Sequence, residues 1–358
     1  MGYGGGQGMT VRVLGIMSGS SLDGLDLALC VFRSEEGSWH FRIERAITVP
    51  YAIGFRERLR TAGEGSAIDL ARLDRDLGNL IGEQATGFIG NDPPDLIASH
   101  GHTIFHQPDE HLTLQIGDGS IIAARTGIPV VYDMRKMDVA LGGQGAPLVP
   151  RGEHDLFPGT DTFLNLGGIA NIAHHTADGS VGYDICPCAQ VLDHLANEAD
   201  RAYDEGGAIA RNGTVHGPLL ATLEAIPFYQ QTPPRSLGRE WTEAHLLPLV
   251  RDAAIPLADR MRTIVEHIAG QVGRECERLG ARRMLVTGGG AHNVLLVDRI
   301  RVRSGVEIVV PDALLIDFKE AMIFAYLGLL RWLKRANCMA SVTGASQDAI
   351  GGALVVAN

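Results

Sequence analysis

Residues 15–26 read Gly15-Ile16-Met17-Ser18-Gly19-Ser20-Ser21-Leu22-Asp23-Gly24-Leu25-Asp26, and they lie between two apolar, β-branched segments, 11–16 and 25–32. Two strands joined by such small turn residues predict a β-hairpin. Few side chains at this turn can block its backbone N–H groups, so these groups can converge on an anion such as a phosphate. The alternative is an ordinary glycine- and serine-rich turn, and this stretch alone favours neither interpretation.

Three carboxylates are candidates for binding a divalent cation. Asp23 and Asp26 would repel a bare phosphate, so we expect a cation between a carboxylate and the phosphate oxygens. The alternative for both is a solvated pair that binds nothing. Glu320 begins an apolar helix predicted over 319–334, where a carboxylate also stabilises the helix N-terminus.

Composition excludes several classes of protein. The 358 residues, 45% of them hydrophobic, suffice for a packed core and favour two domains over one. A net charge of −11 argues against a nucleic-acid or anionic-membrane partner, but not against a nucleotide. No stretch reaches the ~20 apolar residues that cross a bilayer, and residues 1–8 lack the apolar segment of a signal peptide.

The strand–glycine–strand pattern of the N-terminus recurs at residues 162–173, around Gly167 and Gly168. One such unit near the start of each half indicates an internal structural duplication. A third turn, Gly288-Gly289-Gly290, follows a short buried strand. Together the turns favour a nucleotide held between two lobes, although none matches G-x-G-x-x-G or a P-loop. Between the halves, the glycine-rich and charged residues 133–145 predict a hinge.

Polar residues in other positions have both a functional and a structural interpretation. Asp184 ends a predicted strand, where it is a candidate general base or a cap of the next helix, which is predicted from about Gln190 to Tyr203. Arg135 is a candidate ligand of a carboxylate substrate, or forms a surface ion pair with Asp133 or Asp138. From position alone, the structural alternative is favoured for both Asp184 and Arg135.

Histidine and cysteine patterns do not predict a metal site. His100, His102 and His106 form H-x-H-x3-H, but Gly101 and Thr103 predict that the strand ends here, so polar site lining or a hydrogen-bonded structural histidine is preferred. Cys186 and Cys188 do not have the redox C-x-x-C spacing, which favours buried packing. The chain has five cysteines without zinc-type spacing, and we therefore expect a reducing, cytoplasmic location.

Nine segments resemble the anhydro-N-acetylmuramic acid kinase family, in the family's order over nearly the whole chain. They are GIMSGSSLDGLDLAL (15–29), SHGHTIFH (99–106), TLQIGD (113–118), DMRKMDVALGGQGAPLVP (133–150), NLGGIANI (165–172), PRSLGREW (234–241), TGGGAHN (287–293), FKEAMIFAYLG (318–328) and SVTGA (341–345). GGQGAPLVP and NLGGIANI are the specific strings.

The resemblance implies an α/β, two-lobed actin/hexokinase-like (ribonuclease H-like) fold, with duplicated β-sheet cores and ATP in the interlobe cleft. We expect residues 1–133 with 342–358 in the first lobe and residues 134–341 in the second. It also implies that water attacks C1 of 1,6-anhydro-N-acetylmuramic acid and that the released O6 accepts the γ-phosphate of ATP. Because phosphorus traps the leaving oxygen, one carboxylate suffices where an inverting glycosidase needs two.

The resemblance implies a role for each matching residue. Asp184 matches the base, and Asp23 and Glu320 are the candidates for Mg²⁺, which would neutralise charge on the transferred group. The residues that match the nucleotide-binding loops are Gly19, Ser20, Ser21, Leu22, Asp23, Gly24, Leu25, Asp26, Gly167, Gly168, Gly288, Gly289, Gly290 and Asn293. Those expected on the sugar side are His102, Thr103, Arg135 and Glu320.

The chain departs from the usual family pattern in four places. Residues 184–189 read Asp-Ile-Cys-Pro-Cys-Ala where the family commonly has Asp-Thr-Gly-Pro-Gly-Asn. His102 replaces a common Gln, Ser20 a Thr, and Arg235 a Lys. These changes put the pose and identity of the sugar in doubt more than the chemistry. The alternatives are therefore a kinase for another 1,6-anhydrosugar, such as levoglucosan, or a catalytically silent ATP-binding regulator. The resemblance also implies a homodimer.

Overall fold

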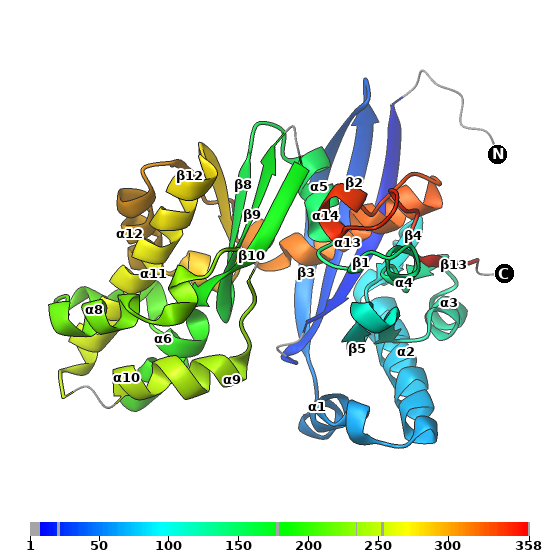
Figure 1. The fold of residues 1–358 in the computed structure, drawn as a ribbon. Helices are drawn as coiled ribbons and strands as arrows, with labels where there is room; N and C mark the ends of the chain where they lie inside the picture. Colours follow the sequence, from blue (N-terminus) through cyan, green and yellow to red (C-terminus); the bar gives the residue numbers. More distant parts are fainter. Residues whose placement is uncertain (1–7, 20–21, 177–178, 234, 252–253, 357–358) are drawn as a thin grey trace. The chain divides into compact units, whose positions relative to one another are not determined.

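The computed structural model describes residues 8–19, 22–176, 179–233, 235–251 and 254–356. The chain divides into two compact units: unit 1 is Met1–Pro158 with Phe318–Asn358, and unit 2 is Gly159–Asp317. Each unit has its own mixed β-sheet and its own apolar core (Figure 1). Within the described part of the chain, no helix is both long and apolar enough to span a membrane.

The predicted N-terminal hairpin is confirmed and lies in the sheet of unit 1. The strands of this sheet are, in spatial order, β13 (Ala353–Val355), β7 (Val130–Tyr132), β4 (Leu96–Ser99), β1 (Met9–Ser18), β2 (Gly24–Glu35) and β3 (Ser38–Pro50). Strands β1, β2 and β3 pair antiparallel, whereas β4 and β7 run parallel to β1. Figure 1 shows β1 to β3 in blue as one long meander.

The sheet of unit 2 repeats this order, which confirms the predicted duplication. Its strands are, in spatial order, β10 (Gly179–Pro187), β9 (Ile169–Thr176), β8 (Thr162–Leu166), β11 (Arg283–Thr287) and β12 (Glu307–Val309). Again the first three pair antiparallel and the last two are parallel to the hairpin's first strand. Ligands of α/β sheets bind at the carboxyl ends of parallel strands, so β8 and β11 should end near a site.

The helices of unit 1 are α1 (Ile53–Arg60), η1 (Ala62–Glu64), α2 (Ala67–Ile89), η2 (Pro108–Glu110), α3 (Gly119–Thr126), α4 (Lys136–Ala140), α5 (Val149–Leu156), α14 (Ala340–Thr343) and most of α13 (Ala313–Trp332). Ser66 starts α2 by accepting a hydrogen bond from the Asp69 N–H. Leu73, Leu77 and Ile81 follow at helical spacing, and they are buried against the sheet.

The helices of unit 2 are α6 (Ala189–Ala196), η3 (Asn197–Ala199), η4 (Glu205–Gly207), α7 (Ala208–Arg211), α8 (Gly217–Glu224), η5 (Pro227–Gln230), α9 (Arg239–Trp241), η6 (Thr242–Leu246), α10 (Leu247–Arg251), α11 (Leu257–Leu279), η7 (Gly289–His292) and α12 (Val294–Ser304). Helix α11 is the centre of the core, because Val265, Ile268 and Val272 on one stripe have no exposed surface.

The structure does not divide the chain where the sequence predicted, at 133/134 and 341/342. Residues 134–158 belong to unit 1 because buried Asp138 ties them to the C-terminal tail. Its Oδ1 accepts a hydrogen bond from Thr343 Oγ1 (2.7 Å), and its Oδ2 accepts one from the Gly145 N–H (2.8 Å). Residues 133–145, predicted as a hinge, therefore form a loop that hydrogen bonds hold inside unit 1.

Helix α13 holds residues 318–332 in unit 1 through a buried ion pair. Lys319 Nζ lies 2.8 Å from Glu153 Oε1 of α5, and both side chains are almost fully buried. The boundary between the units falls at Phe318, where φ of −117° and ψ of 16° interrupt the helix. The sequence predicted this helix only from residue 319, which is the part after the interruption.

Candidate active site

The turn of the first hairpin is shorter than the stretch predicted to bind phosphate. Gly19, Leu22 and Asp23 lie in the turn, whereas Gly24, Leu25 and Asp26 are already paired in β2. Ser20 and Ser21 lie outside the described residues. A Cβ on Gly24 would come within 2.3 Å of the Val49 carbonyl oxygen, so this glycine is required by strand packing. Asp26 accepts a hydrogen bond from Thr48 Oγ1 (2.6 Å).

The two predicted magnesium ligands, Asp23 and Glu320, both lie in unit 1 and are solvent-exposed. Among the described residues, no three His, Cys, Asp or Glu side chains are grouped so that they could hold a metal. Mg²⁺ usually takes one or two carboxylates and completes its shell with substrate phosphates and water. These exposed carboxylates therefore fit an ion that arrives with a nucleotide, and they do not form an all-protein cage.

Arg135 is fixed by two acceptors in unit 1. Its Nε donates to Nε2 of His100 (2.9 Å), and its Nη1 donates to the Gly145 carbonyl (2.7 Å). Burial, and then the charge of Arg135, lowers the pKa of His100 to about 3, so this imidazole stays neutral and can accept. The surface ion pair with Asp133 or Asp138 is wrong, because Lys136 pairs with Asp133 and Asp138 binds the tail loop.

His102 begins a strand that the sequence did not predict. Strand β5 (His102–Gln107) pairs with β6 (Leu112–Ile116) outside the main sheet. Strand β4 ends at Ser99, so the prediction that no continuous strand carries the three histidines is confirmed. His102 is buried, and its Nδ1 lies 3.0 Å from Ser18 Oγ at the end of β1. Thr103 Oγ1 accepts a hydrogen bond from Gln115 (3.2 Å). Two of the predicted sugar-side residues are thus adjacent in one small sheet.

The other histidines of this segment have separate partners. His106 Nδ1 lies 3.0 Å from Thr113 Oγ1, and His100 Nδ1 lies 2.8 Å from the Gly101 carbonyl oxygen. Both side chains are therefore hydrogen-bonded histidines, which is one of the two preferred interpretations.

Asp184, the predicted base, is half-buried next to a β-bulge in β10. The register with β9 shifts between Asp184 and Cys186, a device that re-aims side chains and is common beside active sites. One carboxylate oxygen, Oδ2, accepts hydrogen bonds from the Leu237 N–H (2.8 Å) and from Ser236 Oγ (3.2 Å). Among the described residues, Oδ1 receives no hydrogen bond. Burial raises the pKa of Asp184, and these two hydrogen bonds oppose the rise.

The arrangement does not support the alternative that Asp184 caps the helix after β10. Helix α6 begins after Cys188, and no side chain caps its N-terminus. Instead its first N–H groups, from Cys188, Ala189 and Gln190, donate to the carbonyls of Gly167 and Gly168. The second glycine turn is therefore held by α6, with its two glycines on the side away from the core.

The cysteines that replace the family's glycines are packing residues, as predicted. Cys186 and Cys188 have no exposed surface and no disulfide. Burial raises the pKa of Cys188 to about 12 and that of Cys186 well above its ordinary value, so both remain thiols. They add no charge next to Asp184.

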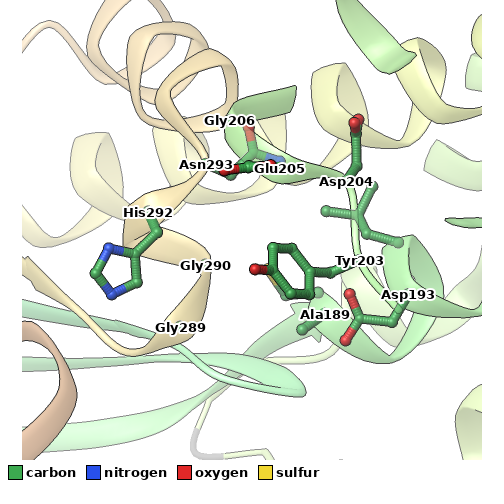
Figure 2. A pocket seen from close by; sticks show the side chains of 12 residues that line it. Ala189, Asp193, Tyr203, Asp204, Glu205, Gly206, Gly289, Gly290, His292 and Asn293 are labelled. Atoms are coloured by element: carbon green, nitrogen blue, oxygen red, sulfur yellow. The ribbon is translucent and has the colours of Figure 1, made fainter. Parts of the chain in front are cut away.

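The third glycine turn lines a pocket of about 670 Å³ that lies entirely in unit 2 (Figure 2). Its lining residues are Cys188, Ala189, Leu192, Asp193, Tyr203, Asp204, Glu205, Gly206, Gly289, Gly290, His292 and Asn293. In Figure 2 the ring of Tyr203 and the carboxylate of Asp193 project toward Gly289 and Gly290. The size is typical of small-molecule sites.

The three glycines of this turn have different roles. A Cβ on Gly288 would lie 2.3 Å from Asn165 Oδ1, and one on Gly290 would lie 2.8 Å from Leu166 Cβ, so both are required for packing on β8. A Cβ on Gly289 would meet no atom within 4 Å. Asn293 caps α12 by accepting from the Leu296 N–H (3.1 Å). Gly289 is thus the residue of this turn that is free to face a ligand.

The sequence did not indicate the other wall of the pocket. A single helix was predicted there up to Tyr203, but α6 ends at Ala196 and Tyr203 lies in a loop. Burial raises the pKa of Asp193, a half-buried residue of α6, to about 6. Asp204 turns the loop by accepting from the Ile209 and Ala210 N–H groups. The Gly206-Gly207 pair could have indicated this loop in the sequence, because both residues have positive φ angles, which glycine adopts readily.

Comparisons with known proteins agree with the resemblance seen in the sequence. A family model described as anhydro-N-acetylmuramic acid kinase matches residues 11–357. A protein of that name from Sulfurovum sp. (strain NBC37-1) is 35% identical over 367 aligned residues, covering 96% of this chain and 99% of the relative. One from Vibrio vulnificus (strain CMCP6) is also 35% identical, covering 95% and 97%.

Among solved structures, an activator of 2-hydroxyisocaproyl-CoA dehydratase from Clostridium difficile with bound ADPNP has a TM-score of 0.45 and 16% identity. The match covers 90% of this chain and 96% of that one.

Proposed function

Because the chain belongs to the anhydro-N-acetylmuramic acid kinase family, we propose that it uses ATP to open and phosphorylate 1,6-anhydro-N-acetylmuramic acid. The product is N-acetylmuramic acid 6-phosphate, as in the recycling of cell-wall sugars. The similarities do not favour the two alternatives, a levoglucosan-type kinase and a silent regulator.

The observation that carries the proposal is the environment of Asp184. One carboxylate oxygen is fixed by two hydrogen bonds, and the other is left without a partner among the described residues. A general base must be oriented and must keep a free lone pair for the proton that it removes. The raised pKa of Asp184 also makes the carboxylate a stronger base.

In the proposed reaction, Oδ1 of Asp184 takes a proton from the water that attacks C1 of the sugar. The C1–O6 bond breaks, and O6 forms a bond to the γ-phosphorus of ATP, which releases ADP. Arg135 is held by His100 and the Gly145 carbonyl, which leaves Nη2 to bind the lactyl carboxylate of the sugar. His102 and Thr103 supply further polar groups on the sugar side.

We assign the nucleoside part of ATP to the pocket of unit 2, with Gly289 and Asn293 on one wall and Tyr203 on the other. The turns at Gly19–Asp26, at Gly167 and Gly168, and at Gly288–Gly290 are assigned to the phosphates. Asp23 and Glu320 would hold Mg²⁺ together with phosphate oxygens, and the ion would neutralise charge on the transferred group.

The proposal extends to the setting of the enzyme. All five cysteines are free thiols in the structure, which suits a reducing compartment, and we assign the protein to the cytoplasm. A homodimer remains a proposal that sedimentation at several concentrations would test.

The test is ADP release with a panel of sugars. We expect release with 1,6-anhydro-N-acetylmuramic acid and Mg²⁺, and at least about tenfold lower kcat/KM with levoglucosan, which has no carboxylate for Arg135. N-acetylmuramic acid, which has no 1,6-anhydro bond, is the control. Equal activity with levoglucosan would contradict the assigned substrate, and no sugar-dependent release would contradict the kinase.

A further inference from the structure

A buried ion pair lies directly behind the segment that contacts Asp184. Arg235 and Glu275 are joined through Nη2 and Oε1 at 2.6 Å, and only 3% and 9% of their side chains are exposed. Glu275 is on α11, the helix at the centre of the unit 2 core. Breaking a buried pair is costly because it leaves an uncompensated charge. The pair therefore holds the segment of Arg235 against helix α11.

The other two nitrogens of Arg235 bind backbone carbonyl groups of Asp184 and Gln231. Its Nε donates to the carbonyl oxygen of Asp184 (3.3 Å), and its Nη1 donates to the carbonyl oxygen of Gln231 (3.0 Å). The Asp184 N–H in turn donates to the Arg235 carbonyl (3.0 Å). One guanidinium therefore connects α11, β10 and the segment after η5.

The geometry of this connection suits arginine, which stands where the family commonly has Lys. The three acceptors lie in different directions around the group, and a guanidinium presents five N–H donors in a planar fork. A lysine has one nitrogen and could not span the two carbonyls and the carboxylate in the same way. The stem of Arg235 is also packed, with its guanidinium carbon 5.0 Å from the ring centre of Phe228.

Glu275 is held in place by partners of its own. Its Oε2 accepts from the hydroxyl of Tyr183 (2.9 Å) and from Nε of Arg278 (2.7 Å), and Arg278 also bonds the Tyr183 hydroxyl. Tyr183 is the neighbour of Asp184 in β10. Glu275 is thus connected to strand β10 twice, once through Arg235 and once through Tyr183.

We propose that Arg235, anchored on Glu275, is a positioning residue that holds Ser236 and Leu237 against Oδ2 of Asp184 and so leaves Oδ1 for the reaction. This inference rests on the proposed function only for the role of Asp184. The clamp itself is a property of the structure that can be measured without substrate.

The experiment compares Arg235→Met with Arg260→Met in the full-length protein. Arg260 is a matched control, because it is also buried and paired with a glutamate, Glu198. Among the described residues its side-chain hydrogen bonds go to Glu198 and not to Asp184, Gln231, Ser236 or Leu237. The first readout is hydrogen exchange of the Leu237 amide without ligands. We expect it to become faster by about tenfold or more in Arg235→Met, since its acceptor is no longer held, and to stay unchanged in Arg260→Met.

The second readout is steady-state kinetics with saturating ATP. In Arg235→Met we expect kcat to fall by about 100-fold while KM for the sugar changes less than about threefold, as for a misplaced base. Glu275→Gln weakens the same ion pair from its α11 side. We expect a smaller loss of kcat, because the amide oxygen of Gln can still accept a hydrogen bond from Arg235. If Arg235→Met does not fold, the Glu275→Gln variant tests the proposal instead.

Leu237 exchange at the wild-type rate in a folded Arg235→Met or Glu275→Gln protein would overturn the proposal. A fall in kcat equal to that of Arg260→Met would overturn it as well. If Asp184→Asn instead kept full turnover while Leu237 lost its protection in Arg235→Met, the clamp would stand and the assignment of the base would fail.

Discussion

Ser18 Oγ lies 3.0 Å from Nδ1 of His102 and accepts a hydrogen bond from the hydroxyl of Tyr51 at 2.7 Å. Ser18 Oγ has one proton and two lone pairs, so while it accepts from Tyr51 it can either donate to Nδ1 of His102 or accept from it. Burial lowers the pKa of His102, so it remains neutral at physiological pH. A neutral imidazole has one N–H donor and one acceptor nitrogen, and it stands where the family commonly has the amide of Gln.

Tyr51→Phe should weaken sugar binding. The substitution removes the hydrogen bond that Tyr51 donates to Ser18, so the hydroxyl that contacts His102 is held less firmly. We expect KM for the anhydrosugar to rise about fivefold with kcat nearly unchanged, the effect of one hydrogen bond. Tyr229→Phe in unit 2 is the control, since its buried hydroxyl has no hydrogen-bond partner among the described residues. An unchanged KM in Tyr51→Phe, measured by steady-state kinetics, would contradict a role of the Tyr51–Ser18–His102 contacts in sugar binding.

The hairpins and the duplication could be predicted because they depend on local sequence. Alternating apolar runs around Gly19 and around Gly167 fix a strand–turn–strand unit without reference to distant residues. The division of the chain could not be predicted, because it depends on Asp138 bonding to Thr343, 205 positions away. A glycine-rich, charged segment looks the same in sequence whether it is a hinge or a tied loop.

The candidate site was predicted in part for the same reason. Asp184 was identified as the base through the family resemblance, whereas its position at the end of a predicted strand favoured a cap, and β10 in fact runs on to Pro187. The donors that hold its carboxylate come from residues 236 and 237. The wall of the pocket at Tyr203 was missed because the helix expected up to Tyr203 ends at Ala196, about two turns earlier. The anchor of Arg235 on Glu275 joins residues 40 positions apart and has no local signal.

Filling the open position of the third glycine turn should block the nucleotide. In Gly289→Leu the new side chain projects into the pocket and meets no protein atom near its Cβ. We expect the Kd for ATP to rise by at least about tenfold, because the ligand and the side chain compete for space, while the melting temperature changes by less than about 3 °C.

Gly217→Leu is the matched control for this variant. Gly217 is also open and exposed in unit 2, but it does not line the pocket. Calorimetry that gave the same Kd for both variants and the wild type would show that the nucleotide binds elsewhere.

His267→Phe should reduce the acid sensitivity of the fold. Burial lowers the pKa of His267 to about 3, against an ordinary value of about 6.5. Between these values the unfolded chain binds a proton that the folded chain excludes, so the free energy of unfolding decreases as the pH falls from 6.5 toward 3. This loss is absent above pH 6.5, where neither state is protonated.

Each such histidine contributes up to about 1.4 kcal/mol per pH unit to this slope. His267 has no hydrogen-bond partner for either ring nitrogen among the described residues, so phenylalanine removes no bond. Urea denaturation at pH 7.5 and pH 5 should show a smaller difference for His267→Phe than for the wild type. An equal or larger difference would contradict a neutral, buried His267.

Asp184→Asn should separate binding from chemistry. The amide has nearly the same shape and its oxygen can still accept from Leu237, but it cannot take a proton from water. We expect the Kd for ATP to stay within about twofold of the wild type and kcat to fall by about 10³-fold or more. A kcat within tenfold of the wild type would assign the base to another residue.

The most direct measurement is a turnover in ¹⁸O-labelled water, followed by mass spectrometry of the sugar phosphate before the label can exchange at the anomeric centre. If Asp184 directs water to C1 while O6 goes to phosphorus, each product molecule carries one ¹⁸O on C1 and none in the phosphate. A product without label on C1, or with label in the phosphate group, would contradict the mechanism.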